Sequence, residues 1–216
     1  MDTRQGIFGT FEVPDPIRIR KVARFMRGYF PSLKGRRLLE CGYAKGGLTD
    51  ILRQEGVTAV CVDMNPRADM DGVHMIQRDL NNGLPSLKER FDIVFAGEVM
   101  EHLYDDEGFL RGVRELLKPD GILALTVPNL VFSVNRLRML FGMTPAFAYA
   151  RYHYHMYTAK TLRALIEEAG FEVAYLASSH FLFSTRRNPI GKVFEVAGDW
   201  LPSWGAHLII FARPKP

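Results

Sequence analysis

The chain has 216 residues, 47% of them hydrophobic and 24% charged, a composition typical of one globular domain that buries a full-sized core. Its two cysteines, Cys41 and Cys61, exclude a disulfide scaffold and lie too far from any histidine cluster to indicate a structural zinc site. The formal net charge of +4 permits an anionic partner but does not require one. No secretory pattern begins the sequence and the longest apolar runs have strand length, so we expect a cytoplasmic protein without a transmembrane segment.

Residues 1–34 are expected to form an N-terminal helical segment. The pair Asp15-Pro16 is typical of a helix cap followed by proline in the first turn. The apolar residues that follow recur at helical spacing: Ile19, Val22, Ala23, Met26, Tyr29 and Phe30. The cations of the same stretch are expected on a solvated face: Arg18, Lys21, Arg24 and Arg27. Without an aromatic or glycine pattern beside them, these cations do not indicate nucleic-acid binding.

Strand-length apolar stretches alternate with helical periods along the rest of the chain. Strands are predicted at 37–41, 57–62, 73–77, 91–96, 122–127, 171–176 and 207–212, and helices near 48–52, 109–117, 130–141 and 158–170. This alternation favours right-handed crossovers and an α/β fold, in which a Rossmann-like, doubly wound, mostly parallel sheet of seven strands carries helices on both faces. We expect residues 1–216 to form a single domain. In such sheets a ligand binds at the carboxyl ends of the strands.

Glycines and carboxylates follow the first two predicted strands. The first strand runs into the sequence ECGYAKGG at 40–47, where small residues allow a sharp turn and a close approach to a ligand. Asp63 lies 21 residues beyond Gly42, at the next strand end, where a carboxylate can bind both ribose hydroxyls. The same spacing fits a relaxed dinucleotide fingerprint, so an NAD(P)-dependent oxidoreductase is one alternative. Glu40 argues against it, because a carboxylate would repel a pyrophosphate but suits the α-ammonium of a methionine moiety. Glu40 could also simply order its own loop by accepting backbone N–H bonds.

With the segments that follow, this pattern resembles the class I S-adenosylmethionine-dependent methyltransferases, in particular the small type 11 and type 23 group. Six motifs occur in the family's order, at 38–46, 62–65, 79–80, 91–103, 116–121 and 158–171. The resemblance implies that the last strand runs antiparallel to the other six. It also implies that the cofactor is S-adenosyl-L-methionine.

The resemblance implies a cofactor site at these positions: Glu40, Gly42, Tyr43, Gly46, Asp63, Met64, Asp79, Leu80 and Glu98. In it, Asp63 would hold the ribose, Met64 would pack on adenine, and Glu98 would lie under the methionine part. Tyr43 and Ala44 depart from the smaller, glycine-rich family pattern, and we expect Tyr43 to cover the methionine end. Because of this departure, a non-catalytic module that keeps the sheet is a second alternative.

Residues 129–157 are expected to form a substrate-side insertion after the fifth strand. Val134, Leu137 and Phe141 share one helical face, which predicts a helix over the pocket mouth. In the aromatic stretch that follows, we predict that His153 and His155 act as the base or position the acceptor. A base is needed when a hydroxyl must lose its proton, whereas the leaving thioether needs no acid. We therefore predict methyl transfer to a hydroxyl, or less favourably an amine, of a small-molecule acceptor.

Two other interpretations of this region stay open. The aromatic residues could be core, or, together with Arg136 and Arg138, they could form a membrane-surface helix.

A second group of polar residues, Glu98, Glu101 and His102 with His153 or His155, could hold a divalent metal. Similar residues bind metal in small-RNA 2′-O-methyltransferases and ubiquinone-pathway O-methyltransferases. A Glu-His pair is, however, common here in family members for which no metal is implied. We therefore predict no metal ligand, with Glu101 and His102 opening a helix and packing locally.

Overall fold

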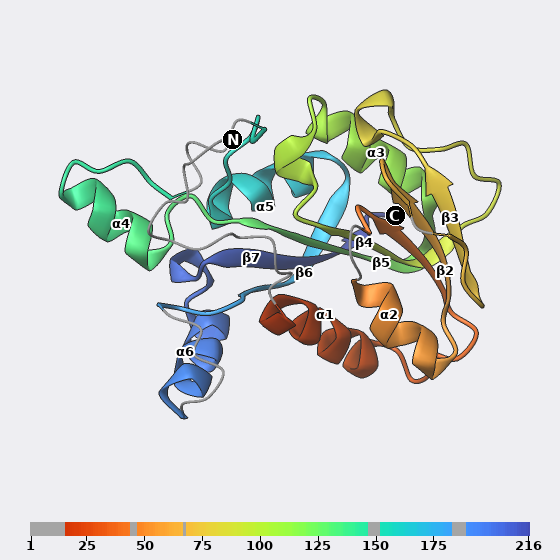
Figure 1. Cartoon of the computed structure of the whole chain (residues 1–216), viewed down its shortest axis with the longest axis horizontal. Helices are drawn as coiled ribbons and strands as arrows, with labels where there is room; N and C mark the ends of the chain where they lie inside the picture. Colours follow the sequence, from red (N-terminus) through yellow and green to blue (C-terminus); the bar gives the residue numbers. More distant parts are fainter. Residues whose placement is uncertain (1–15, 44–46, 67, 147–151, 183–188) are drawn as a thin grey trace, which may run out of the picture.

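The computed structural model describes residues 16–43, 47–66, 68–146, 152–182 and 189–216, and its centre is a seven-stranded sheet (Figure 1). The strands are β1 (Arg37–Cys41), β2 (Thr58–Asp63), β3 (Val73–Gln77), β4 (Phe91–Gly97), β5 (Leu117–Pro128), β6 (Phe171–Ser178) and β7 (His207–Pro214). They lie in the order β3-β2-β1-β4-β5-β7-β6. Pairing is parallel from β3 to β5, whereas β7 is antiparallel to both its neighbours. The predicted mostly parallel sheet with an antiparallel last strand is confirmed.

Helices lie on both faces of this sheet. The helices of the described chain are α1 (Pro16–Tyr29), α2 (Leu48–Leu52), α3 (Asp106–Leu116), α4 (Ser133–Leu140), α5 (Ala159–Glu168) and α6 (Pro189–Trp200). In Figure 1, α1 and α2 lie below the sheet and α3 and α5 above it. Successive strand residues face opposite sides, so Leu38 packs in the cluster of α1 and α2 and Leu39 in that of α3 and α5. Both strand faces are therefore buried, as parallel sheets require.

The predicted ends of α5 are confirmed by local chemistry. The Thr158 hydroxyl accepts a bond from the backbone N–H of Thr161, and the Thr161 hydroxyl accepts one from the backbone N–H of Thr158. This capping box satisfies two amides at the start of the helix. At the other end Gly170 has φ +88°, the left-handed conformation that glycine adopts without steric cost.

The structure differs from the expected helices in two places. The predicted helix α4 is present, but Leu137 and Phe141 of its apolar face are exposed. Figure 1 shows α4 projecting from the body of the protein. Helix α6 was not among the predicted helices. Gly191 and Gly198 interrupt its pattern, although Pro189 suits the first turn of a helix.

The carboxyl ends of the central strands carry the predicted polar residues. Gly42 directly follows β1, Asp63 ends β2, and Glu98 follows β4, which lies beside β1. A short 3₁₀ turn, η3 (Met100–His102), then leads toward α3. None of the described helices is both long and apolar enough to cross a bilayer.

Candidate active site

The turn after β1 is built around Gly42. This residue has φ +75°, and a Cβ placed on it would lie 2.4 Å from the Cγ2 of Val99. Its N–H donates to the carbonyl of Val62 over 2.8 Å. The first loop thus lies directly against the segment that follows β4, as a site at adjacent strand ends requires.

Glu40 is only 1% exposed and orders the start of α2. Its Oε1 accepts from the N–H of Leu48 over 3.0 Å, and its Oε2 from the N–H of Thr49 over 2.7 Å. Burial raises the pKa of Glu40 to about 7, although the bonds from Thr49 and Leu48 oppose the rise. A Cβ on Gly47 would lie 1.9 Å from Oε1, so the carboxylate position depends on that glycine. The loop-ordering role is present, and the contact with a cofactor ammonium stays a prediction.

Carboxylates also fix the loops at the ends of β2 and β3. Asp63 Oδ1 accepts from the N–H of Asn65 over 2.8 Å, and Asp79 Oδ1 accepts from the N–H of Asn81 over 2.9 Å. Asp79 thereby caps a 3₁₀ turn, η2 (Leu80–Asn82). Met64 is 56% exposed, which leaves an apolar surface beside Asp63. The ribose and adenine roles of these residues stay predictions.

Tyr43 and Gly46 stand apart from the other predicted cofactor residues. The Tyr43 ring is buried in the core, and its hydroxyl donates to Asp50 Oδ1 over 2.9 Å. The expectation that this side chain covers the methionine end is not met, so we expect only its backbone near the cofactor. Gly46, with Ala44 and Lys45, lies outside the described residues.

Glu98 combines backbone strain with an ion pair to the buried Arg18. Its φ of +56° is the only positive value of a non-glycine residue in the described part of the chain. Such strain is typical of functional sites. Its carboxylate lies 2.7 Å from Nη1 of Arg18 and accepts from the Thr126 hydroxyl over 3.1 Å, and Nε2 of His207 lies 3.5 Å away.

Arg18 was expected on a solvated face of α1, and this is wrong. The residue is 7% exposed, and its Nε is buried without a hydrogen-bond partner among the described residues. One signal in the sequence could have found it, because Arg18, Val22 and Met26 are four residues apart and share the buried stripe.

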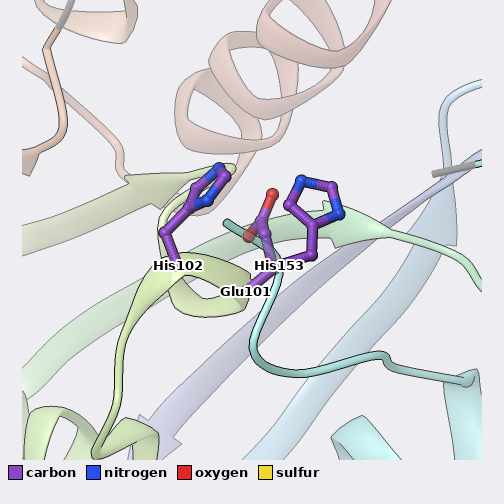
Figure 2. Close-up of side chains that lie close together, drawn as sticks. All are labelled: Glu101, His102 and His153. Carbon is purple, nitrogen blue, oxygen red and sulfur yellow. The ribbon is translucent and has the colours of Figure 1, made fainter. Parts of the chain in front are cut away.

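Glu101, His102 and His153 form a polar cluster at η3 (Figure 2). One ligand atom of each lies within 4.8 Å of the other two, and Figure 2 shows the Glu101 carboxylate between the two imidazoles. His102 Nδ1 lies 2.8 Å from the carbonyl of Tyr152. Because a carbonyl can only accept, Nδ1 carries the proton and the lone pair of His102 is on Nε2.

The electrostatics of this cluster are unusual for a protein interior. Glu101 is 1% exposed, and neither carboxylate oxygen has a hydrogen-bond partner among the described residues. Burial raises the pKa of Glu101 well above its usual range, and the charge of Glu98 adds to the rise. Burial also lowers the pKa of His153, as does His102. A buried carboxyl without a partner must hold a proton or bind a cation, and the lowered pKa of His153 suits the second case, because a neutral imidazole can bind a cation.

His155 belongs to a different arrangement. Its Nδ1 lies 3.7 Å from Oδ2 of Asp106, and its Nε2 is buried without a partner in the described chain. The Tyr157 hydroxyl donates to the same Asp106 oxygen over 2.7 Å. A small cavity meets both arrangements and is lined by Glu101, Pro128, Leu130, Ala146, His153, His155 and Met156. The five residues that the sequence grouped as candidate metal ligands are therefore not all together. Glu98 pairs with Arg18, and His155 lies beside Asp106.

Comparison with known proteins identifies the family. Residues 16–176 match a family model described as a methyltransferase domain. A ubiquinone biosynthesis O-methyltransferase of Azorhizobium caulinodans is 31% identical over 180 residues, covering 77% of this chain and 68% of the relative. Other ubiquinone biosynthesis O-methyltransferases match over 42% or 57% of their own length.

Solved structures agree on the fold. An S-adenosylmethionine-dependent methyltransferase from Clostridium acetobutylicum aligns with a TM-score of 0.63 at 8% identity, covering 95% of this chain and 94% of that one. A 1,6-didemethyltoxoflavin-N1-methyltransferase of Burkholderia thailandensis, solved with S-adenosylhomocysteine, aligns with a TM-score of 0.61 at 16% identity, covering 92% and 79%. The family match favours neither the nicotinamide alternative nor a non-catalytic module. This chain is an enzyme that belongs to the class I S-adenosylmethionine-dependent methyltransferases.

Proposed function

We propose that this methyltransferase moves the methyl group to a hydroxyl of a small molecule bound in the cavity beside η3. The observation that carries the proposal is the Glu101 carboxylate, which is buried without a partner in the described chain, between two imidazoles. Such a group needs a ligand, and a hydroxyl or a cation held near it would supply one. The name of the Azorhizobium relative, an O-methyltransferase, supports a hydroxyl acceptor, whereas the Burkholderia N1-methyltransferase keeps an amine as the alternative.

The cofactor would lie across the ends of β1, β2 and β4. Asp63 would accept the ribose hydroxyls, and Met64 would cover adenine. At the methionine end, Arg18 offers a buried guanidinium whose Nε has no hydrogen-bond partner among the described residues. We infer that Arg18 binds the methionine carboxylate, while Glu98 and Glu40 face the ammonium.

We infer that His155 serves as the base, because its Nε2 is buried without a partner among the described residues and it lines the cavity. In the step we propose, the acceptor O–H bond breaks and its proton moves to Nε2 of His155. The oxygen attacks the methyl carbon, and the C–S bond breaks with its electron pair remaining on sulfur. Asp106 would stabilise the resulting imidazolium through Nδ1, and the present 3.7 Å separation would shorten to a hydrogen bond. His153 would position the acceptor from the opposite wall.

The donors Glu101, His102 and His153 fit a divalent cation. They comprise one carboxylate and two imidazoles, the buried carboxylate has no other partner in the described part of the chain, and His102 already directs its lone pair through Nε2. A bound cation would lower the pKa of an acceptor hydroxyl. This interpretation replaces our expectation of local packing without metal.

The test uses catechol and aniline as probe acceptors with methyl-labelled S-adenosylmethionine. Transfer to catechol should require added Mg²⁺ or Mn²⁺ and should stop on chelation. Glu101→Gln should abolish Mn²⁺ binding measured by electron paramagnetic resonance, whereas the control His74→Ala, at an exposed histidine paired with Asp69, should retain it. Transfer that survives chelation would refute the cation while leaving the base in place. Transfer to aniline alone would refute the hydroxyl acceptor.

A further inference from the structure

Most of the large apolar side chains exposed in the described chain, apart from those around the cavity mouth, lie in two places. The first is the α4 tip, residues 137–143, where Leu140 is 77% and Phe141 70% exposed. The second is the α6 face, formed by Val193, Val196 and Trp200, with Trp200 82% exposed. The spacing of these three residues puts them on one side of α6. Exposed apolar groups of this extent mark an interaction surface.

The α4 tip and the α6 face lie at the same end of the molecule. Figure 1 shows both helices projecting outward beside β6 and β7. Arg136 of α4 joins them, because its guanidinium lies 4.1 Å from the ring centroid of Trp204, in the 3₁₀ turn η4 (Pro202–Trp204) that follows α6. Its Nη2 also donates to the carbonyl of Ser203 over 3.2 Å. Arg136 therefore links α4 to the turn that directly follows α6.

Carboxylates are absent from the sequence around α4 and are paired with cations on α6. No aspartate or glutamate occurs between Asp120 and Glu167, a stretch that includes all of α4 and its flanks. Arg136 and Arg138 lie in it, and neither has a carboxylate within ion-pair distance among the described residues. On α6, by contrast, both acids are paired with cations of α1: Asp199 with Lys21 at 2.6 Å and Glu195 with Arg20 at 3.8 Å.

We propose that the α4 tip and the α6 face dock this enzyme onto the surface of an anionic lipid bilayer. Leu140, Phe141 and Trp200 would enter the boundary between headgroups and acyl chains, and Arg136 and Arg138 would lie at the level of the phosphates. A partner protein could also cover apolar side chains. The absence of carboxylates over the whole segment from 121 to 166 favours a surface of uniform negative charge.

Docking there would bring the cavity close to the bilayer. Leu130 and Ala146, which line the cavity, lie on the two flanks of α4. The docking proposal does not depend on which atom is methylated, and it is tested without an acceptor.

The test is cosedimentation of the full chain with vesicles of phosphatidylcholine alone or mixed equally with phosphatidylglycerol. We expect binding to the mixed vesicles that weakens as salt rises. The double variant Leu140→Gln with Phe141→Gln keeps the net charge, so about tenfold weaker binding would come from the lost apolar contacts. The control Tyr175→Gln removes an exposed aromatic ring outside both surfaces and should bind like the native protein. Thermal stabilisation by S-adenosylhomocysteine should be unchanged in all three proteins.

Three results would overturn the proposal. They are no binding to mixed vesicles, equal binding by the double variant, and concentration-dependent self-association that the double variant abolishes in sedimentation velocity. The last result would make the surface an interface between copies of the chain.

Discussion

Replacing Gly47 by alanine tests whether Glu40 holds the first loop in place. A Cβ at this position would lie 1.9 Å from Oε1 of Glu40, so the carboxylate must leave the N–H groups of Leu48 and Thr49. Each charge-assisted bond lost from a buried site costs about 1.5–3 kcal/mol, and the pair costs about 3–6 kcal/mol in the free energy of unfolding. For a chain of this length that lowers Tm by roughly 6–24 °C.

The same substitution at Gly28 is the matched control. A Cβ there meets nothing within 4 Å, and the residue lies in the last turn of α1. Alanine favours a helix over glycine by at most about 1 kcal/mol, so Gly28→Ala should leave Tm unchanged or raise it slightly. Calorimetry of both variants, with and without S-adenosylhomocysteine, gives the comparison. Native stability and native cofactor affinity in Gly47→Ala would refute the role given to Glu40.

Three further predictions concern single carboxylates. Burial raises the pKa of Glu40 to about 7. As pH rises from about 4.5 to 7, ionising this carboxyl should therefore lower the free energy of unfolding by about 3 kcal/mol in total. A cationic ligand favours the ionised form, so calorimetric affinity for S-adenosylhomocysteine should rise through pH 7 in the native protein and stay flat in Glu40→Gln. The partners of buried Asp92, first Lys118 and then Arg36, outweigh desolvation and hold its pKa below the usual range. The ionised Asp92 carboxylate therefore stabilises the fold above about pH 4, and this stabilisation is lost on acidification. Asp92→Ala should lower the free energy of unfolding by about 3 kcal/mol at pH 7, and by a smaller amount below pH 4. Asp106→Asn should lower kcat for catechol about tenfold or more and shift the acidic limb of the rate profile, with KM for the cofactor unchanged; an unshifted profile would contradict its link to a base.

Strands were predictable from the sequence because parallel strands buried on both faces are short continuous apolar runs. β4 illustrates this, since all residues from Phe91 to Ala96 are buried and its bounds were found within one residue. Helices were less predictable where apolar residues do not face the core. In the sequence, the apolar residues of α4 and α6 have the spacing of a buried helix face. Only the position of these helices in the fold shows that the residues are exposed.

The places of Gly42, Asp63 and Glu98 at the strand ends could be predicted because the strands themselves were predictable. Their contacts with the cofactor stay predictions. The acceptor side could not be resolved in this way, because Glu101 and His153 are brought together by tertiary structure. Two backbone contacts do this: the N–H groups of Tyr154 and His155 lie 2.7 Å and 3.4 Å from the carbonyl oxygen of Glu101. Sequence spacing alone could not distinguish the roles of His153 and His155. In the structure His153 lies beside His102, and His155 lies beside Asp106.

The strained turn at Glu98 lies between the two sites that we propose, one for the cofactor and one for the acceptor. β4 ends at Gly97, where a Cβ would lie 2.6 Å from the Phe95 ring, so the chain leaves the sheet close to its own last aromatic side chain. The left-handed conformation of Glu98 then reverses the backbone, and its N–H donates to the carbonyl of Thr126 over 2.8 Å. Three residues later Glu101 faces the cavity.

Glu98→Gly would relieve the backbone strain but remove the partner of Arg18, whereas Glu98→Gln would keep the strain and remove only the charge. If the ion pair holds the methionine end, both variants should bind S-adenosylhomocysteine at least about tenfold more weakly, which titration calorimetry would measure. Weakening in Glu98→Gly alone would instead assign the role of this residue to its backbone conformation.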